Sequence, residues 1–301
     1  MNHTRRLFLV GSTAVAASLL PPMNGARARE MSHPSGIELY SVAEPLKGDV
    51  DGTLTAIHDM GYREVETSGF ADLSAKAFRQ ALDRAGLRCP SCHLKFDGDD
   101  WGPQFEDAHT MGAQYAVSSI LIDFKGTRSA EQAFARIDAV DLDGLKQIIE
   151  KANRIAEAAA RAGLKYAYHN HNFEFKRLYD SRYGYDLLLE QTDKHLVSFE
   201  LDCGWMRLAG VDPVEYLKAH GRRIRMLHLK DFMKEDAAST RLGEHKGAEL
   251  GHGFIDFAPI VAAGKGAGVE HYFYEQEPPF FGTTPLEAAK VSAKYLERLN
   301  L

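Results

Sequence analysis

The feature that most constrains the fold of this chain is a regular alternation of short β-rich runs with amphipathic helical stretches, which starts at residue 36. Small turn residues introduce most of the runs, and apolar residues recur at helical spacing at residues 73–85, 143–162 and 285–299. Strand and helix repeated eight times close most simply into a single (β/α)8 TIM barrel of the α/β class. The expected strands are residues 36–42, 61–67, 86–94, 113–121, 163–171, 196–202, 224–231 and 269–277.

A doubly wound open sheet is the alternative for such a repeat, but no Gly-rich dinucleotide fingerprint follows the first strand. The chain beyond its N-terminal segment has about 270 residues, which suits one large barrel. No low-complexity linker divides it, and we predict one barrel domain over residues 29–301. The longest irregular segment, residues 232–256, follows the seventh strand, where a barrel places a loop over its active face.

The first 28 residues have the pattern of an export signal. Arg5-Arg6 precedes an apolar run too short to span a bilayer, and Ala26-Arg27-Ala28 is a small-x-small cleavage site. The sequence therefore predicts a twin-arginine signal peptide over residues 1–28 and a periplasmic mature protein. An N-terminal membrane anchor is the alternative, which the Gly and Ser residues within the run disfavour. No other apolar run is long enough to cross a membrane, so we expect no membrane association after the signal is removed.

The charge of the mature chain excludes one class of partner. Without Arg5, Arg6 and Arg27, the 36 basic residues fall to 33 against 42 acidic ones, so the net charge changes from −6 to −9. Because phosphate binding needs a basic face, we expect no nucleic-acid partner.

Polar side chains crowd the C-terminal ends of the last four strands, where a barrel of this kind places its chemistry. Alternation along a strand puts residues two apart on the same side, so imidazole and carboxylate groups from four strands converge, as a divalent metal requires. Each residue alone is more often a capping or hydrogen-bonded group. Four buried polar clusters without a shared purpose, however, would cost desolvation. These ends are His169-Asn170-His171-Asn172, Glu200-Leu201-Asp202, His228-Leu229-Lys230-Asp231 and Glu275-Gln276-Glu277.

Four motifs occupy these ends in order: YHNHNFEF (168–175), LDCGW (201–205), HLKDF (228–232) and YFYEQE (272–277). They resemble motifs of the sugar phosphate isomerase/epimerase-like proteins of the xylose-isomerase-like TIM barrel superfamily. The resemblance covers residues 36–299 and implies a sugar isomerase or epimerase.

The resemblance also implies which residues bind a metal. In that group one metal typically lies between an acidic residue after the fifth strand, an Asp after the sixth, a His after the seventh and a Glu after the eighth. The expected cofactor is one divalent ion, Mn, Co, Fe, Zn or Mg. His169 stands where the group more often has Glu, which leaves the choice between His169 and His171 open. Carried over to this chain, the ligands are His169, Asp202, His228 and Glu275.

A sugar pocket is implied beside the metal. Hydroxyl-rich substrates need paired donors and acceptors and an aromatic face. For Trp205 the alternative is core packing, and for Lys230 it is a solvated strand end. The expected substrate contacts are Glu66, His171 and Trp205, and the expected catalytic residues are Glu275 as base, with His93 and Lys230 stabilising oxygen charge.

The stretch Cys89–His93 reads CPSCH, the pentapeptide to which c-type haem is attached. It falls on the third strand, where a haem would have to lie inside a packed barrel, so we predict no haem and expect His93 in the pocket. Three residues apart on an extended strand, Cys89 and Cys92 are expected to point to opposite faces, too far apart for an easy bridge. The chain has three cysteines, too few for a disulfide scaffold.

The function predicted from these residues is a metal-dependent isomerase or epimerase acting on an unphosphorylated sugar or keto-sugar through an enediolate. The same enediolate could eliminate a β-leaving group, which makes a keto-glycoside lyase or hydratase the first alternative. A non-catalytic exported sugar-binding protein is an alternative of another class, and an endonuclease of the same superfamily fits poorly with the charge of −9. Phosphorylated substrates are scarce outside the cytoplasm. The partner is a small-molecule sugar, and whether the barrel forms a homo-oligomer stays open.

Overall fold

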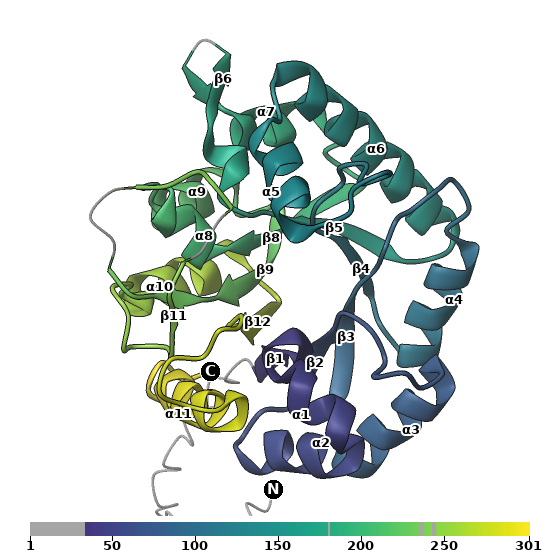
Figure 1. The fold of residues 1–301 in the computed structure, drawn as a ribbon, viewed down its shortest axis with the longest axis vertical. Helices are drawn as coiled ribbons and strands as arrows, with labels where there is room; N and C mark the ends of the chain where they lie inside the picture. Colours follow the sequence, from purple (N-terminus) through teal and green to yellow (C-terminus); the bar gives the residue numbers. More distant parts are fainter. Residues whose placement is uncertain (1–33, 180, 235–237, 243–244) are drawn as a thin grey trace, which may run out of the picture. The chain divides into compact units, whose positions relative to one another are not determined.

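The computed structural model describes residues 34–179, 181–234, 238–242 and 245–301 (Figure 1). A closed barrel of parallel strands confirms the predicted (β/α)8 fold, and each barrel strand lies within the residues expected for it or within one residue of them. The predicted signal peptide, residues 1–28, lies outside the described residues. Around the barrel the strands are β1 (Ser35–Glu38), β12 (His271–Tyr274), β9 (Ile224–Leu229), β8 (Val197–Asp202), β5 (Lys165–His169), β4 (Tyr115–Ser118), β3 (Arg88–His93) and β2 (Glu64–Thr67).

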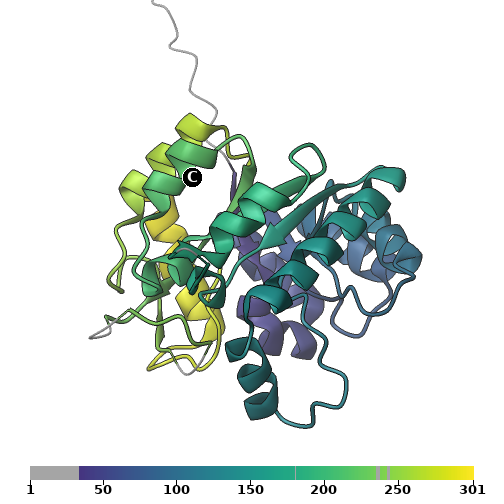
Figure 2. The same cartoon turned by 90° about the horizontal axis from the view of Figure 1, so that it is seen from above.

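Helices lie outside the strands and alternate with them along the chain, as Figure 1 shows and Figure 2 repeats from a direction turned by 90°. Among the described residues, no helix is both long and apolar enough to span a bilayer. The helices are α1 (Ala43–Gly48), α2 (Val50–Asp59), α3 (Ala75–Ala85), α4 (Gly102–Met111), α5 (Ala130–Asp138), α6 (Leu142–Arg161), α7 (Gly184–Gln191), α8 (Cys203–Leu208), α9 (Pro213–His220), α10 (Phe257–Ala267) and α11 (Pro285–Arg298).

The ends of the three helices predicted from periodicity follow from their capping residues. The side chain of Ser74 accepts a hydrogen bond from Ala77 N and fixes the start of α3, while Gly86, with φ of 73°, ends it. Asp141 caps α6 in the same way, and Thr284 forms a capping box that starts α11. The predicted helices therefore differ from the observed ones by one or two residues at their ends.

The first barrel strand is shorter than predicted. It ends at Glu38, and residues Leu39–Val42 form a 3-10 helix. The Glu38 side chain accepts a hydrogen bond from Tyr40 N at 3.4 Å, which caps this turn. Glu38 is therefore a strand-end residue, at the same end of the barrel as the polar ends of β5, β8 and β9.

The prediction that Cys89 and Cys92 point to opposite faces is wrong. In the pairing of β2 with β3, Glu64 lies opposite Arg88 but Glu66 lies opposite Ser91, so β3 carries one extra residue. Such a bulge reverses the alternation of side chains, and the two Sγ atoms lie 3.7 Å apart. Both thiols are buried and free.

This burial supports the expectation that the CPSCH stretch holds no haem. Cys89 is 2% exposed and Cys92 is 0% exposed, so neither sulfur can reach a porphyrin without opening the barrel. Purified mature protein is therefore expected to show no Soret band, even when it is produced together with haem-attachment machinery. A covalent haem peptide that contains both cysteines would contradict this prediction.

The carboxylate of Asp231 holds part of the predicted loop after the seventh barrel strand through hydrogen bonds. β10 (Asp231–Phe232) pairs with β11 (Gly247–Ala248) in an antiparallel ribbon. Asp231 accepts hydrogen bonds at 3.0–3.2 Å from the backbone N–H groups of Gly251, Gly253 and Ile255. Residues 251–255 are thereby held beside the C-terminal end of β9.

Candidate functional site

The four predicted metal ligands come together at the C-terminal end of the barrel. His169 ends β5, Asp202 ends β8, His228 lies in β9, and Glu275 follows β12. One ligand atom from each lies within 4.8 Å of those of the others, and all four residues are buried. Parallel register explains this, because His228 lies opposite both Asp202 and Phe273, two residues before Glu275. Their role as metal ligands stays a prediction.

Glu200 lies beneath this cluster and contacts three imidazoles. Its Oε2 atom lies 2.9 Å from His93 Nε2, 3.0 Å from His169 Nδ1 and 3.3 Å from His228 Nε2. The sequence analysis did not include Glu200 among the site residues. The sequence does indicate Glu200, because alternation along β8 puts it on the same side as Asp202. The depth of Glu200 below the ligands, however, depends on the geometry of the barrel.

Opposite charges stabilise one another in this buried layer. Burial opposes ionisation of Glu200, but His228 and the hydrogen-bonded imidazoles outweigh it and hold the pKa of the carboxyl well below its usual range. Burial likewise opposes protonation of His228, but Glu200 and hydrogen bonds to Glu275 and Glu66 hold its pKa well above the usual value. The pKa of His93 is also held well above its usual value, because Glu66 and Glu200 outweigh burial.

His169 and Asp202 differ from these groups, because burial dominates their protonation. Burial lowers the pKa of His169 to about 4, so its imidazole is neutral and keeps a lone pair for a metal. The contact of Nδ1 with Glu200 favours a proton on that nitrogen, which leaves Nε2, 4.0 Å from Asp202 Oδ2, as the ligand atom. Burial raises the pKa of Asp202 to about 7.

The donor set fits a divalent cation. Asp202 Oδ1 accepts a hydrogen bond from Trp205 N at 2.8 Å, but Oδ2 is buried and accepts none. A buried carboxylate oxygen without a hydrogen-bond donor costs free energy unless a cation neutralises it, and Lys230 Nζ, 3.6 Å away, forms an ion pair but no hydrogen bond with it. Neutral imidazole nitrogen together with carboxylate oxygen is the combination that Mn, Co, Fe and Zn accept in proteins, and His169 offers such a nitrogen. His228, paired with carboxylates through both ring nitrogens, would release a proton on binding the ion.

A cavity of about 420 Å³ opens beside this cluster, with His169 and Glu275 on its wall. His93, His171 and Trp205, all predicted to line the pocket, are on its wall. The rings of His171 and Trp205 lie 5.7 Å apart, and His171 Nδ1 and Trp205 Nε1 are buried without a hydrogen-bond partner. A bound polyol can supply those partners.

One predicted contact, Glu66, is placed differently from expectation, and the alternative for Lys230 does not hold. Glu66 is fully buried and is not on the cavity wall, since its carboxylate accepts hydrogen bonds from Ser91 Oγ and from His228 Nε2 at 2.6 Å. It therefore orients His228 and does not reach the cavity. Lys230 is no solvated strand end, because its Nζ lies 2.5 Å from Glu277 Oε1 and 2.9 Å from Glu275 Oε2.

Glu38 is a site residue that the sequence analysis missed. It lies on the cavity wall, and its Oε2 atom is buried without a hydrogen-bond partner. Burial and the nearby Glu66 carboxylate raise its pKa to about 8. At neutral pH the Glu38 carboxyl therefore carries a proton that it can donate. The predicted strand ran past Glu38, so that its place at a strand end was not visible.

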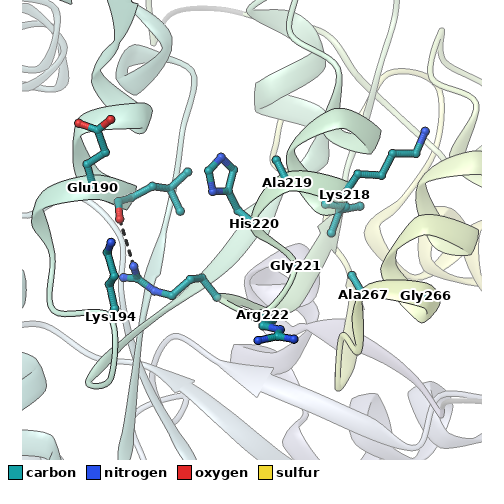
Figure 3. A pocket seen from close by; sticks show the side chains of 12 residues that line it. Glu190, Lys194, Lys218, Ala219, His220, Gly221, Arg222, Gly266 and Ala267 are labelled. Atoms are coloured by element: carbon teal, nitrogen blue, oxygen red, sulfur yellow. Dashed lines mark hydrogen bonds between the residues drawn. The ribbon is translucent and has the colours of Figure 1, made fainter.

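Another cavity, of about 530 Å³, lies at the opposite end of the barrel strands. Figure 3 shows it between the ends of α7, α9 and α10, with Glu190, Lys194, Lys218, His220 and Arg222 on its wall. Arg222 precedes the first residue of β9, whereas His228 is near the last. This cavity is therefore separate from the candidate metal centre.

Known proteins resemble this chain in sequence and in structure. An inosose dehydratase of Clostridium perfringens is 33% identical over 169 residues, 52% of this chain and 55% of that protein, so the chain spans about half the length of this curated relative. A sugar phosphate isomerase/epimerase from Parabacteroides distasonis superposes with a TM-score of 0.72 at 25% identity, over 88% of this chain and 98% of that chain.

A zinc-binding protein shares the fold at lower identity. The structure of IOLI protein with a bound zinc atom superposes with a TM-score of 0.62 at 15% identity, over 88% of this chain and 97% of that one. The sequence model of one family, the Xylose isomerase-like TIM barrel, matches residues 54–299. The chain therefore belongs to the xylose isomerase-like TIM barrel family, as the strand-end motifs predicted.

Proposed function

We propose that this chain is a metal-dependent enzyme that removes a proton from the carbon next to the carbonyl of an unphosphorylated sugar or keto-sugar. The observation that carries the proposal is the convergence of His169, Asp202, His228 and Glu275 beside an open cavity. Isomerisation, epimerisation and dehydration of a keto-sugar can all begin with this proton transfer. The names of the inosose dehydratase and of the isomerase/epimerase neighbour are consistent with it.

His169, Asp202, His228 and Glu275 would hold the ion, and the zinc site of the IOLI structure supports a divalent one. When bound, a divalent ion supplies Lewis acidity at the carbonyl and the neighbouring hydroxyl.

The protein's own groups would move the protons. Burial opposes ionisation of Glu275, but Lys230 and His228 hold the pKa of its carboxyl well below the usual range, so it stays ionised and can accept the α-proton. Glu38, protonated at neutral pH, can return a proton to carbon or oxygen. Lys230 Nζ, 2.9 Å from Glu275 Oε2, would act through that carboxylate, since Lys230 itself is not on the wall of this cavity.

The cavity wall favours an unphosphorylated substrate. Glu38, Glu275 and Glu277 line it, and none of the described residues on that wall is an arginine or a lysine. A phosphate group would meet carboxylates there, and the His93 imidazole on this wall is already paired with Glu200 and Glu66.

Elimination is the second candidate reaction. After the base has taken the α-proton, a β-hydroxyl or β-glycosyl oxygen can leave if an acid protonates it. The protonated carboxyl of Glu38 on the cavity wall can do this, and the relative of 33% identity is named as a dehydratase.

A deuterium-exchange screen tests the proposal. Metal-loaded mature protein is incubated in D2O with a panel of aldo-sugars, keto-sugars and cyclic polyol ketones, and α-deuteration is followed by NMR. We expect exchange with at least one compound, abolished by a chelator and restored by Mn or Co. Sugar binding in calorimetry without exchange in any compound would instead support a non-catalytic binding protein.

We also propose that the mature protein is periplasmic, from the Arg5-Arg6 pair and the apolar run that follows it. Replacing both arginines by lysine is expected to trap full-length precursor in the cytoplasm, because the export machinery reads that pair. Fractionation and immunoblotting measure this. Normal processing of the double variant would overturn the twin-arginine interpretation.

A further inference from the structure

A second cavity adjoins the one beside the candidate metal centre. It has a volume of about 510 Å³, and the two cavities share Phe134, Trp205 and Glu277 on their walls. Pockets for small ligands usually have volumes of about 300–1,000 Å³, so each of the two is large enough alone. The space open to a substrate therefore extends well beyond one sugar ring at the metal.

Aromatic and proline residues make up most of the wall of the second cavity. We call it the aromatic compartment and define it by Trp205, Phe232, His245, Pro278 and Phe281. The ring centroids of Trp205 and Phe232 lie 5.0 Å apart, and those of Trp205 and His245 lie 5.7 Å apart. The rings are tilted against one another by 50° and 74°, so they form a curved apolar surface. Such a surface favours another ring in tilted or stacked contact.

Exposed apolar side chains gather at this place. The described residues include Tyr40, Leu73, Phe134, Met233 and Phe281 as exposed large hydrophobic side chains. Three of these line the two cavities: Tyr40 the metal-side cavity, Phe281 the aromatic compartment and Phe134 both. Because exposed apolar groups that gather around a hollow mark binding surfaces, this end of the barrel is shaped for an apolar ligand.

The polar groups of the compartment fit an aromatic ring better than a second sugar. Lys230 and Glu277 neutralise each other at 2.5 Å, and Lys246 Nζ lies 5.8 Å from the centre of the Phe281 ring. A second sugar would need several donors and acceptors for its hydroxyls, whereas an aromatic ring can lie beside the ammonium group. At the junction of the cavities, the buried Trp205 Nε1 has no hydrogen-bond partner and can donate to a bridging oxygen.

We infer that the aromatic compartment binds the aromatic aglycone of a glycoside whose sugar lies beside the metal centre. The substrate class is then an aryl glycoside or its keto derivative, and not a free monosaccharide. This inference rests on the proposed function for the placement of the sugar. Its test is a binding measurement, which does not depend on turnover.

The test compares ligands that differ only in the group on the anomeric oxygen. Methyl glycosides, 4-nitrophenyl glycosides and disaccharides of glucose, galactose and mannose are titrated into the metal-loaded mature protein by calorimetry. For the sugar that binds, we expect the 4-nitrophenyl glycoside to bind at least about tenfold more tightly than the methyl glycoside, from burial of the ring.

Two matched variants locate the effect. Phe281→Ala is expected to reduce the preference for the aryl glycoside to less than about threefold, with methyl glycoside binding unchanged. Phe281 is 52% exposed, so its truncation should leave the fold intact, and thermal melting checks this. Leu73→Ala removes a comparably exposed apolar side chain outside both cavities and is expected to change nothing.

Several results would overturn the inference. One is that methyl and aryl glycosides bind equally tightly, that a disaccharide binds most tightly, or that no glycoside binds. Another is that Phe281→Ala and Leu73→Ala show the same preference for the aryl glycoside. Failure of the proposed function is a different result, since it is the absence of metal-dependent α-proton exchange. Tighter binding of the aryl glycoside without α-proton exchange would contradict the proposed reaction, but it would still support the binding of an aromatic group in the aromatic compartment.

Discussion

Glu275→Gln is expected to lose at least about a hundredfold in the rate of α-proton exchange while it retains part of its bound metal. The amide keeps the shape of the side chain and one oxygen ligand, but it cannot accept the proton. Glu275 Oε2 receives one hydrogen bond from His228 Nδ1 and is 2.9 Å from Lys230 Nζ, so the site holds this group firmly. Deuterium exchange by NMR and metal content by mass spectrometry measure the two effects separately.

Glu277→Gln is the matched control for this variant. Glu277 is two residues away, contacts the same Lys230 Nζ and lines the same cavity, but it is not in the ligand set. Its amide variant should keep the metal and retain exchange within about tenfold of the parent. An equal loss of exchange rate in both variants would show that the rate depends on the negative charge around Lys230 and that Glu275 is not the base.

Gly204→Ala is expected to destabilise the barrel by about 1–3 kcal/mol and to weaken metal binding. Gly204 is the second residue of α8, between Asp202 and Trp205, and a Cβ there would overlap the carbonyl oxygen of Lys230 and lie 2.8 Å from Lys230 Cβ. Backbone cannot move aside as a flexible side chain can, so α8 must shift away from β9. The melting temperature should fall by roughly 2–4 °C per kcal/mol in a chain of this size.

Gly266→Ala controls for the loss of a glycine. A Cβ at Gly266, in α10, would meet nothing within 4 Å. Because Ala suits a helix better than Gly, this variant should melt at the same temperature as the parent or slightly higher. A Gly204→Ala variant as stable as Gly266→Ala would contradict the close packing of α8 on β9.

The positions of the eight strands and of the polar clusters at their ends could be predicted from the sequence for one physical reason, whereas the choice of four ligands within those clusters came from the resemblance to the family. Buried strands of a parallel barrel are apolar, so a polar cluster such as His169 to Asn172 stands out at the strand end. Parallel strands then bring such clusters to one end of the barrel, whatever their separation along the chain.

Other parts of the site could not be predicted, because they depend on local departures from regular geometry. The bulge that brings Cys89 and Cys92 to one side is a feature of register between two strands. The strand end at Glu38 depends on a turn that no glycine or proline announces. The depth of Glu66 and Glu200 below the ligands, and the contribution of Phe134 and Phe281 from segments beyond the barrel strands, depend on tertiary packing.

The measurement that tests the proposed metal centre most directly is the metal content of Asp202→Ala and His228→Ala beside that of the parent protein. These residues lie near the ends of neighbouring strands, and the parallel register of β8 and β9 places them opposite each other in the cluster. After loading with Mn or Zn and removal of free ions, the parent should hold about one metal ion per chain. Each variant should lose most of that metal, and circular dichroism checks that it is still folded. Full metal content in both variants would contradict the proposed centre and would favour a sugar-binding protein without a catalytic metal.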